Sequence, residues 1–141
     1  MYIGAVLNLE ESLLLKETLL TRIDPKPLGF VFETKSGMML PHHMTVNMGR
    51  FDESLNNPSI LGKDVELTIS KFLYNENICC AVVDSALLED ETPVHSSNKN
   101  KHITMCLRPP TKPVESNKLF EKSSVLHVEP FVIYATVSEI E

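Results

Sequence analysis

Apolar and polar residues alternate along several stretches of this chain with the period of two that is typical of β-strands with one buried face. The clearest stretch is Val65–Tyr74, where every second residue up to Ile69 is apolar. The polar residues Asn75–Asn77 follow, and the apolar run Ile78–Val83 comes next. Two strand patterns separated by a short polar turn predict a β-hairpin here.

The N-terminal part of the chain predicts a strand followed by a helix. Tyr2–Leu9 is apolar with a strand-like start, whereas Glu10–Arg22 has leucines near helical spacing and acidic residues at its front. The prolines of Asp24–Pro27 end this helix. The remaining elements expected are a short extended segment at Phe30–Phe32, a loop or short helix at 49–62, a polar loop at 84–100, a short helix from the N-cap Ser116 to Lys122, and a last strand over Val128–Val137.

These elements add up to six or seven strands and two or three helices, with the strands in hairpin-like order. That pattern predicts an α+β fold with a mostly antiparallel sheet. A length of 141 residues is enough to bury a substantial core without disulfides or metals, so we expect one domain over residues 1–141.

One four-residue pattern occurs twice, as His43–Val46 and as His102–Met105, and the two histidines are 59 positions apart. The composition of the chain predicts only about 0.06 matches by chance. On a strand, each histidine shares a face with the threonine two residues later, while the aliphatic residues face the other way. The positions predicted to face the core are Met44, Val46, Met48, Ile103, Met105 and Leu107.

Two histidines on neighbouring strands can act as a general acid and a general base, because the pKa of imidazole is close to neutral. In phosphodiester cleavage, one of His43 and His102 takes a proton from the attacking hydroxyl or water, and the other protonates the leaving oxygen. Thr45 and Thr104 donate hydrogen bonds to the non-bridging oxygens of the phosphate. The sequence leaves open which histidine is the acid.

The doubled His42 and His43, together with His102, also suggest metal ligands. However, the chain has no HExxH spacing, no paired CxxC and no acidic residue at ligand spacing. We therefore expect neither a metal nor a cofactor. His42 is expected to point away from His43, into or beside the core.

Paired HxTx strands are the signature of the 2H phosphoesterase superfamily, and the chain resembles this superfamily over its whole length. The resemblance implies a bilobal fold in which two pseudo-symmetric lobes with few helices form a concave sheet. It also implies a metal-independent phosphodiesterase for small nucleotides, such as 2′,3′-cyclic phosphates, 2′-5′ linked oligonucleotides, ADP-ribose cyclic phosphate or cyclic dinucleotides. Members encoded by phages cleave the cyclic dinucleotide signals of anti-phage defence.

A phage and bacterial group within this superfamily is similar in two further features. In that group a doubled histidine opens the first motif, as His42 and His43 do here, and a Lys-Pro-x-x-Ser-Asn element follows the second motif. This chain has that element as Lys112–Asn117. The similarity does not identify a substrate.

Five further residues are candidates for substrate binding. Lys101 and Arg108 flank the second motif, where a cation would neutralise a phosphate. Ser116 and Asn117 stand at a predicted helix N-terminus, which favours anions, and Tyr2 offers a ring for base stacking. Each also has a structural interpretation: solvated strand ends for the cations, simple capping for Ser116 and Asn117, and core packing for Tyr2.

Charge and cysteine content narrow the expected partners and location. A net charge of −6 argues against long nucleic acid, whereas a small nucleotide or one RNA end needs few basic contacts. Three cysteines in apolar settings favour free thiols in a reducing compartment. No membrane span or cleavable leader is visible. We expect a cytoplasmic protein, in the host cytoplasm if it is phage-encoded, and the sequence does not indicate its oligomeric state.

The leading hypothesis is therefore a 2H-type phosphodiesterase that cleaves a small cyclic or 2′-linked nucleotide. The first alternative is a 2′,3′-cyclic phosphodiesterase that acts on RNA ends in RNA repair. The second is a module that binds a nucleotide or RNA end without cutting it. The third is a structural or interaction protein in which both motifs are coincidental.

Overall fold

The computed structural model describes all 141 residues as six strands, one α-helix and two short 3-10 helices. The strands are β1 (Tyr2–Leu7), β2 (His43–Asn47), β3 (Asp64–Tyr74), β4 (Ile78–Leu88), β5 (His102–Leu107) and β6 (Ser124–Ile140). The helices are α1 (Leu9–Leu20), η1 (Pro58–Ile60) and η2 (Pro113–Phe120). None of the helices is long and apolar enough to span a lipid bilayer.

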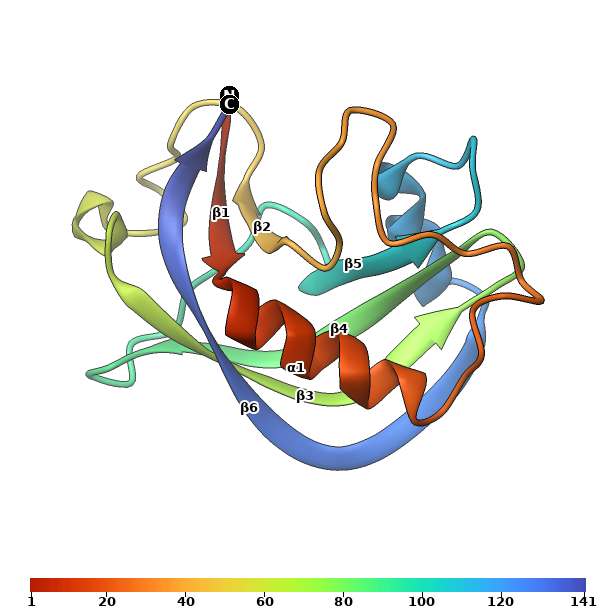
Figure 1. Ribbon diagram of the computed structural model, residues 1–141. Helices are drawn as coiled ribbons and strands as arrows, with labels where there is room; N and C mark the ends of the chain where they lie inside the picture. Colours follow the sequence, from red (N-terminus) through yellow and green to blue (C-terminus); the bar gives the residue numbers. More distant parts are fainter.

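The six strands form a closed antiparallel barrel in the order β1-β2-β5-β4-β3-β6 (Figure 1). The first and last strands pair, with Tyr2 opposite Ile140, so the two ends of the chain lie side by side. An α+β fold with a mostly antiparallel sheet is thus confirmed. The concave sheet with two lobes that the resemblance implies is not shown as such, because β6 pairs with both β1 and β3 and closes the sheet into a barrel.

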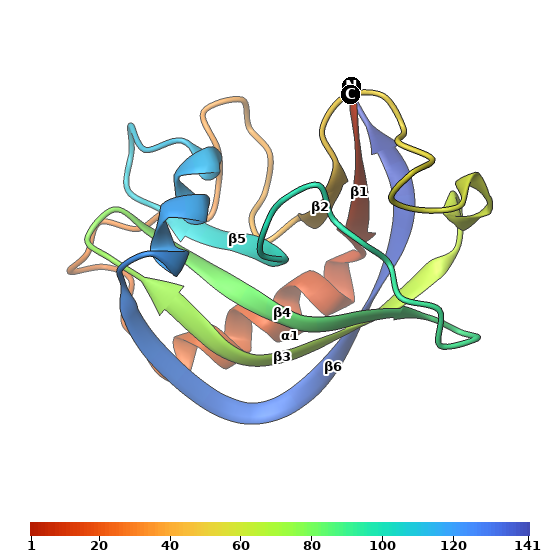
Figure 2. The same ribbon diagram turned by 180° about the vertical axis from the view of Figure 1, so that it is seen from behind.

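β6 is the longest strand and curves beneath the whole molecule (Figure 2). It begins four residues before the predicted start at Val128 and continues to Ile140. Its ladder with β3 breaks between the pairs Ile69–Phe131 and Lys71–His127. Pro130 lies inside this break, where its missing N–H removes no ladder hydrogen bond. The strand therefore continues through a proline that the sequence pattern marks as an interruption.

The predicted hairpin is formed by β3 and β4, and the side chain of Asn75 organises its turn. The Oδ1 atom of Asn75 accepts hydrogen bonds from the backbone N–H groups of Asn77 (2.8 Å) and Ile78 (3.0 Å). This arrangement is the Asx-turn that favours asparagine at such positions. β4 then extends to Leu88, five residues beyond the predicted end at Val83.

The main core is a cluster of 25 buried residues drawn from all six strands and from α1. α1 begins at the N-cap Asn8, whose side chain accepts a hydrogen bond from the N–H of Glu11. The helix packs across the face of the barrel between β1 and β6 and buries Leu15 and Leu19 completely (Figure 1). A second cluster of six buried residues includes Leu40 and Leu119, which anchor the segment before β2 and η2.

Two local predictions were wrong. Met48 does not face the core and is 64% exposed, because β2 ends at Asn47 and the chain leaves the strand. Ser116 is not an N-cap, since η2 already begins at Pro113 and its N-cap is Lys112. The proline at the first helical position explains the earlier start.

Candidate active site

The two motif strands β2 and β5 meet at a single antiparallel bridge, between Met44 and Ile103. This register places His43 opposite Thr104 and Thr45 opposite His102. Side chains that face each other across two antiparallel strands have Cβ atoms about 5 Å apart. The aliphatic residues of both motifs are fully buried on the other face, as the alternation predicts. Each histidine is therefore aligned with the threonine of the other motif, and all four side chains face the same side of the two strands.

β2 and β5 separate on both sides of this bridge, and a different segment fills each gap. On one side, Val31 exchanges two backbone hydrogen bonds with Leu107 of β5 (2.8 and 3.1 Å), which ties down an irregular hairpin over residues 31–40. On the other side, the N–H of Ser97 donates to the carbonyl of Val46 (2.8 Å). The hydroxyl of Ser96 donates to the carbonyl of Thr45 (2.6 Å). These two segments form walls around the four motif side chains.

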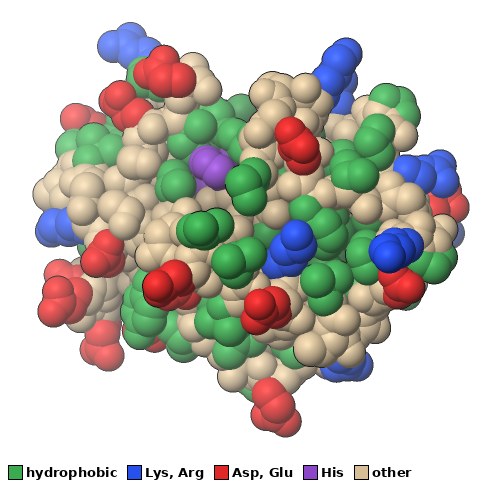
Figure 3. Space-filling view, in the orientation of Figure 1, with side chains coloured by type: hydrophobic (Ala, Val, Ile, Leu, Met, Phe, Trp, Pro, Cys, Tyr) green, Lys and Arg blue, Asp and Glu red, His purple; other side chains and the backbone are tan.

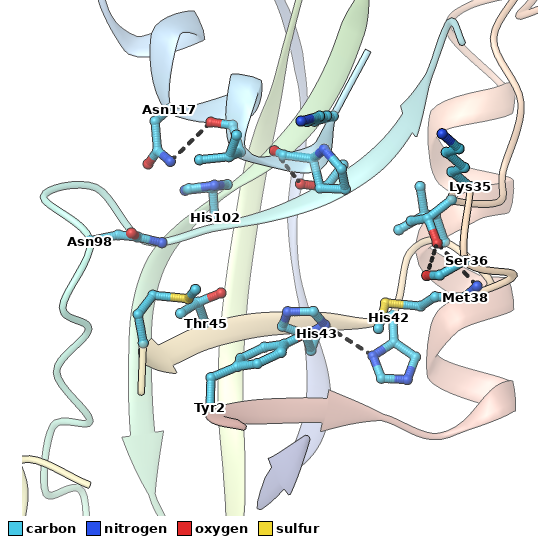
Figure 4. Close-up of a pocket in the computed structure, with 17 residues that line it drawn as sticks. Tyr2, Lys35, Ser36, Met38, His42, His43, Thr45, Asn98, His102 and Asn117 are labelled. Atoms are coloured by element: carbon cyan, nitrogen blue, oxygen red, sulfur yellow. Dashed lines mark hydrogen bonds between the residues drawn. The ribbon is translucent and has the colours of Figure 1, made fainter. Parts of the chain in front are cut away.

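A cavity of about 560 Å³ lies between these walls, and all four motif side chains line it. Figure 4 shows His43 and His102 pointing into it from β2 and β5, with Thr45 on the same side of β2. In the space-filling view a histidine is visible between two raised parts of the molecule (Figure 3). The cavity is lined by Tyr2, Thr34, Lys35, Ser36, Met38, Leu40, His42, His43, Thr45, Met48, Asn98, His102, Thr104, Lys112, Pro113, Val114 and Asn117.

The ring of His102 is held in one tautomer. Its Nδ1 atom lies 2.8 Å from the carbonyl oxygen of Asn100, and since a carbonyl only accepts, Nδ1 carries the proton. Neutral His102 therefore has a free lone pair on Nε2. His102 is 7% exposed, and its burial lowers its pKa, although the bond to Asn100 opposes this effect. The ring of Phe120 packs against it with 5.6 Å between centroids.

His43 has a different partner, the neighbouring ring of His42. The two Nδ1 atoms are 2.9 Å apart, so one of them donates to the other (Figure 4). Burial is the largest of three effects that together lower the pKa of His43 to about 4, and the charges of His42 and His102 are the other two. Burial also lowers the pKa of His42. The ring of Tyr2 lies on the other side of His43, with 5.2 Å between centroids.

Thr104 is positioned from η2. Its hydroxyl lies 2.9 Å from the hydroxyl of Ser116, which is fully buried. The backbone carbonyl of Pro113 lies 3.5 Å from the same Thr104 oxygen. η2 thus contacts the active-site face of β5 and fixes the orientation of one motif threonine.

The predicted substrate-binding residues divide into two groups. Tyr2 and Asn117 line the cavity, whereas Lys101 and Arg108 do not. Ser116 is close to the site but buried beneath Thr104, so it contacts a motif residue and not the cavity.

Several lining residues were missed by the sequence reasoning. His42 points toward His43 and not away from it, because it precedes the first residue of β2 and does not follow strand alternation. Its doubling with His43 was a visible signal. Asn98 comes from the 84–100 loop, and Lys112 opens the Lys112–Asn117 element. Lys35 had no signal in the sequence.

The structure contains no group of three or more His, Cys, Asp or Glu side chains placed to hold a metal ion. His42, His43 and His102 lie in one cavity, but no carboxylate or thiol lines it with them. The side chains that line the cavity can transfer protons, donate hydrogen bonds and, through Lys35 and Lys112, attract an anion.

Comparison with protein families identifies the chain. The model of the fungal tRNA ligase phosphodiesterase domain matches residues 39–131, a stretch that includes both histidine motifs. The chain belongs to this family. The fungal tRNA ligase phosphodiesterase domain is related to the 2H phosphoesterase superfamily, so the resemblance of the chain is confirmed at the level of the superfamily.

A crystal structure of a fungal RNA kinase has a similar fold. The similarity has a TM-score of 0.54 at 15% sequence identity, and it covers 96% of this chain but 45% of that one. The chain thus spans less than half the length of the matched protein. No curated protein sequence matches the chain.

Proposed function

We propose that this member of the fungal tRNA ligase phosphodiesterase domain family hydrolyses 2′,3′-cyclic phosphates at RNA ends. The observation that carries the proposal is the antiparallel crossing of β2 and β5, which pairs each motif histidine with the threonine of the other motif in one cavity. Such a crossing brings two imidazoles and two hydroxyls around a space where one phosphate fits.

In this proposal His102 is the general base. Its Nδ1 proton is committed to Asn100, so its free Nε2 lone pair accepts a proton from the attacking water. The oxygen of this water forms a bond to phosphorus as the bond from phosphorus to one ribose oxygen breaks. The products are a terminal phosphomonoester and a free ribose hydroxyl.

His43 is the general acid and protonates the leaving ribose oxygen from Nε2. The shared Nδ1 hydrogen bond allows His42 and His43 together to hold one extra proton as a coupled pair. After His43 has given up its Nε2 proton, the shared proton remains on its Nδ1 atom and both rings are neutral. The pair is then ready to take up a proton again.

Thr45 and Thr104 donate hydrogen bonds to the non-bridging oxygens as negative charge develops on them. If the Ser116 hydroxyl donates to the Thr104 oxygen, the Thr104 proton has only the Pro113 carbonyl at 3.5 Å as an acceptor, and it turns from this long hydrogen bond to the phosphate.

The family membership favours RNA ends over the free cyclic dinucleotides and other small nucleotides of our leading sequence hypothesis. An enzyme is favoured over a binding module because both motifs are intact and face one cavity.

The test is a short RNA that ends in a 2′,3′-cyclic phosphate, with product analysis by mass spectrometry. We expect the parent protein to add one water to this end, and His43→Ala and His102→Ala each to lower kcat by roughly 10²–10⁴-fold. The matched control is His127→Ala, an exposed histidine on β6 outside the cavity. Recovery of tightly bound but uncut RNA would favour the binding module instead.

A further inference from the structure

The cavity contains cations but no anions, in a chain that is acidic overall. Among the 17 lining residues are Lys35 and Lys112, and none is Asp or Glu. The chain as a whole has 19 acidic residues against 13 lysines and arginines. The local field at the cavity is therefore more positive than the net charge of −6 indicates.

Neither lysine of the cavity is neutralised by the protein itself. The one ion pair between side chains joins Lys118 to Glu115 at 2.8 Å. Lys35 and Lys112 therefore have no carboxylate oxygen within 4.0 Å. An ammonium group that faces a cavity without such a partner is free to bind an anion of a ligand.

Lys35 lies in the turn of the 31–40 hairpin, at the opposite end of the cavity from Asn98 and Asn117. Figure 4 shows Lys35 and Ser36 on one side, the two amides on the other, and the motif histidines between them. A hydrogen bond within the turn stabilises it: the Thr34 hydroxyl oxygen accepts a hydrogen bond from the backbone N–H of Met38 (3.1 Å).

The hydroxyls of this turn add to its capacity for anions. The Thr34 and Ser36 oxygens are 3.1 Å apart, so one hydroxyl donates to the other and the second proton remains available. Gly37 takes φ +90°, a left-handed conformation that closes the turn and that other residues rarely adopt. The turn thus presents an ammonium and a hydroxyl to the cavity.

We propose that Lys35 binds the phosphate that links the terminal nucleotide to the rest of the RNA strand, and that Lys112, the other cation of the cavity, strengthens the attraction for this phosphate. This inference rests on the proposed function. When the cyclic phosphate is bound between the motif histidines and threonines, the next phosphate of the RNA lies one ribose away along the strand. A cyclic mononucleotide has no such phosphate, so the subsite selects oligonucleotide ends over mononucleotides.

The test compares 2′,3′-cyclic AMP with a trinucleotide that ends in a 2′,3′-cyclic phosphate. For the parent protein we expect kcat/KM to be at least about tenfold higher for the trinucleotide. In Lys35→Met and in Lys112→Met the ratio of the two kcat/KM values falls roughly five- to tenfold, because each variant loses one phosphate contact. Lys35→Arg restores most of the ratio.

Salt dependence gives a second readout. Each lost phosphate contact reduces the slope of log kcat/KM against log salt by about 0.7 for a single strand. The matched control is Lys122→Met, which removes the same charge from an exposed lysine outside the cavity and leaves both the ratio and the slope unchanged.

The outcomes separate the two proposals. If the parent turns over neither substrate, the proposed function fails and this inference fails with it. If the parent cleaves both substrates equally well, or if Lys35→Met and Lys112→Met leave the ratio at the parental value, the inference is overturned while the proposed function stands.

Discussion

His42 and His43 hold a single proton between their Nδ1 atoms, so their titrations are not independent. When His42 is cationic, its Nδ1–H occupies the bond and opposes protonation of His43. The charge of His42 lowers the pKa of His43 for this reason, after the larger effect of burial. The proton supply of the acid therefore depends on a residue outside the repeated motif.

His42→Asn is expected to raise the pKa of His43, because it removes the neighbouring charge while the burial remains. A general acid must be protonated to act, so a higher pKa of His43 moves the alkaline limb of the pH profile of kcat/KM to higher pH. NMR titration of the His43 imidazole, together with the pH profile, measures both effects.

A matched control for this change is His127→Asn, which replaces an exposed histidine outside the cavity. The control should leave the titration of His43 and the pH profile at their parental values. An unaltered pKa of His43 in His42→Asn would contradict the coupling of the two rings.

The motif residues were predictable from sequence because a period of two fixes which side chains share a face of a strand. This argument places His43 with Thr45 and His102 with Thr104, but it ends where the strands end. His42, Lys35 and Asn98 lie outside regular strands, so no period assigns their direction. Their positions come from tertiary hydrogen bonds that the sequence does not display.

At the level of elements, the 84–100 loop, which carries Asn98 to the cavity, is joined to the 49–62 loop and not only to the barrel. The side chain of Asn56, in the 49–62 loop, is 7% exposed and reaches the backbone of His95. Its Nδ2 donates to the carbonyl of His95, and its Oδ1 accepts from the N–H of the same residue, both at 2.8 Å. Asn56 thereby holds the segment that carries Asn98 to the cavity.

Asn56→Ala is expected to lower the free energy of unfolding by about 2–3 kcal/mol, because it leaves two backbone groups of His95 without partners. Urea unfolding at constant m-value measures this change. The control Asn57→Ala removes an exposed cap of η1 and costs about 1 kcal/mol. Equal losses in the two variants would mean that Asn56 does not anchor the segment.

The hairpin over residues 31–40 illustrates why the walls of the cavity, unlike the motif strands, were not predictable from the sequence. An extended segment at Phe30–Phe32 was expected, and Val31 does pair, in an isolated bridge to Leu107. Its partner strand lies more than seventy positions away in the sequence. Such long-range pairings depend on where β2 leaves β5, and a local hydrophobic pattern does not contain that information.

At the scale of the molecule, closure of the barrel bears on whether the chain unfolds as one cooperative unit or as two lobes. The seam between β2 and β5 has one bridge, whereas β6 pairs along both β1 and β3. The large buried cluster nevertheless crosses the seam, since Met44 and Ile103 belong to it together with residues of every other strand. Core packing, more than backbone pairing, joins the two motifs.

We expect residues 1–141 to unfold as one domain in a single transition, because the main buried cluster takes residues from all six strands. Far-ultraviolet circular dichroism and tyrosine fluorescence should give the same midpoint, and the calorimetric and van't Hoff enthalpies should agree. Met44→Ala opens a cavity at the fully buried seam and should cost about 2–5 kcal/mol. This loss should shift the whole transition; two separate transitions in the variant would instead reveal lobes that fold independently across β2 and β5.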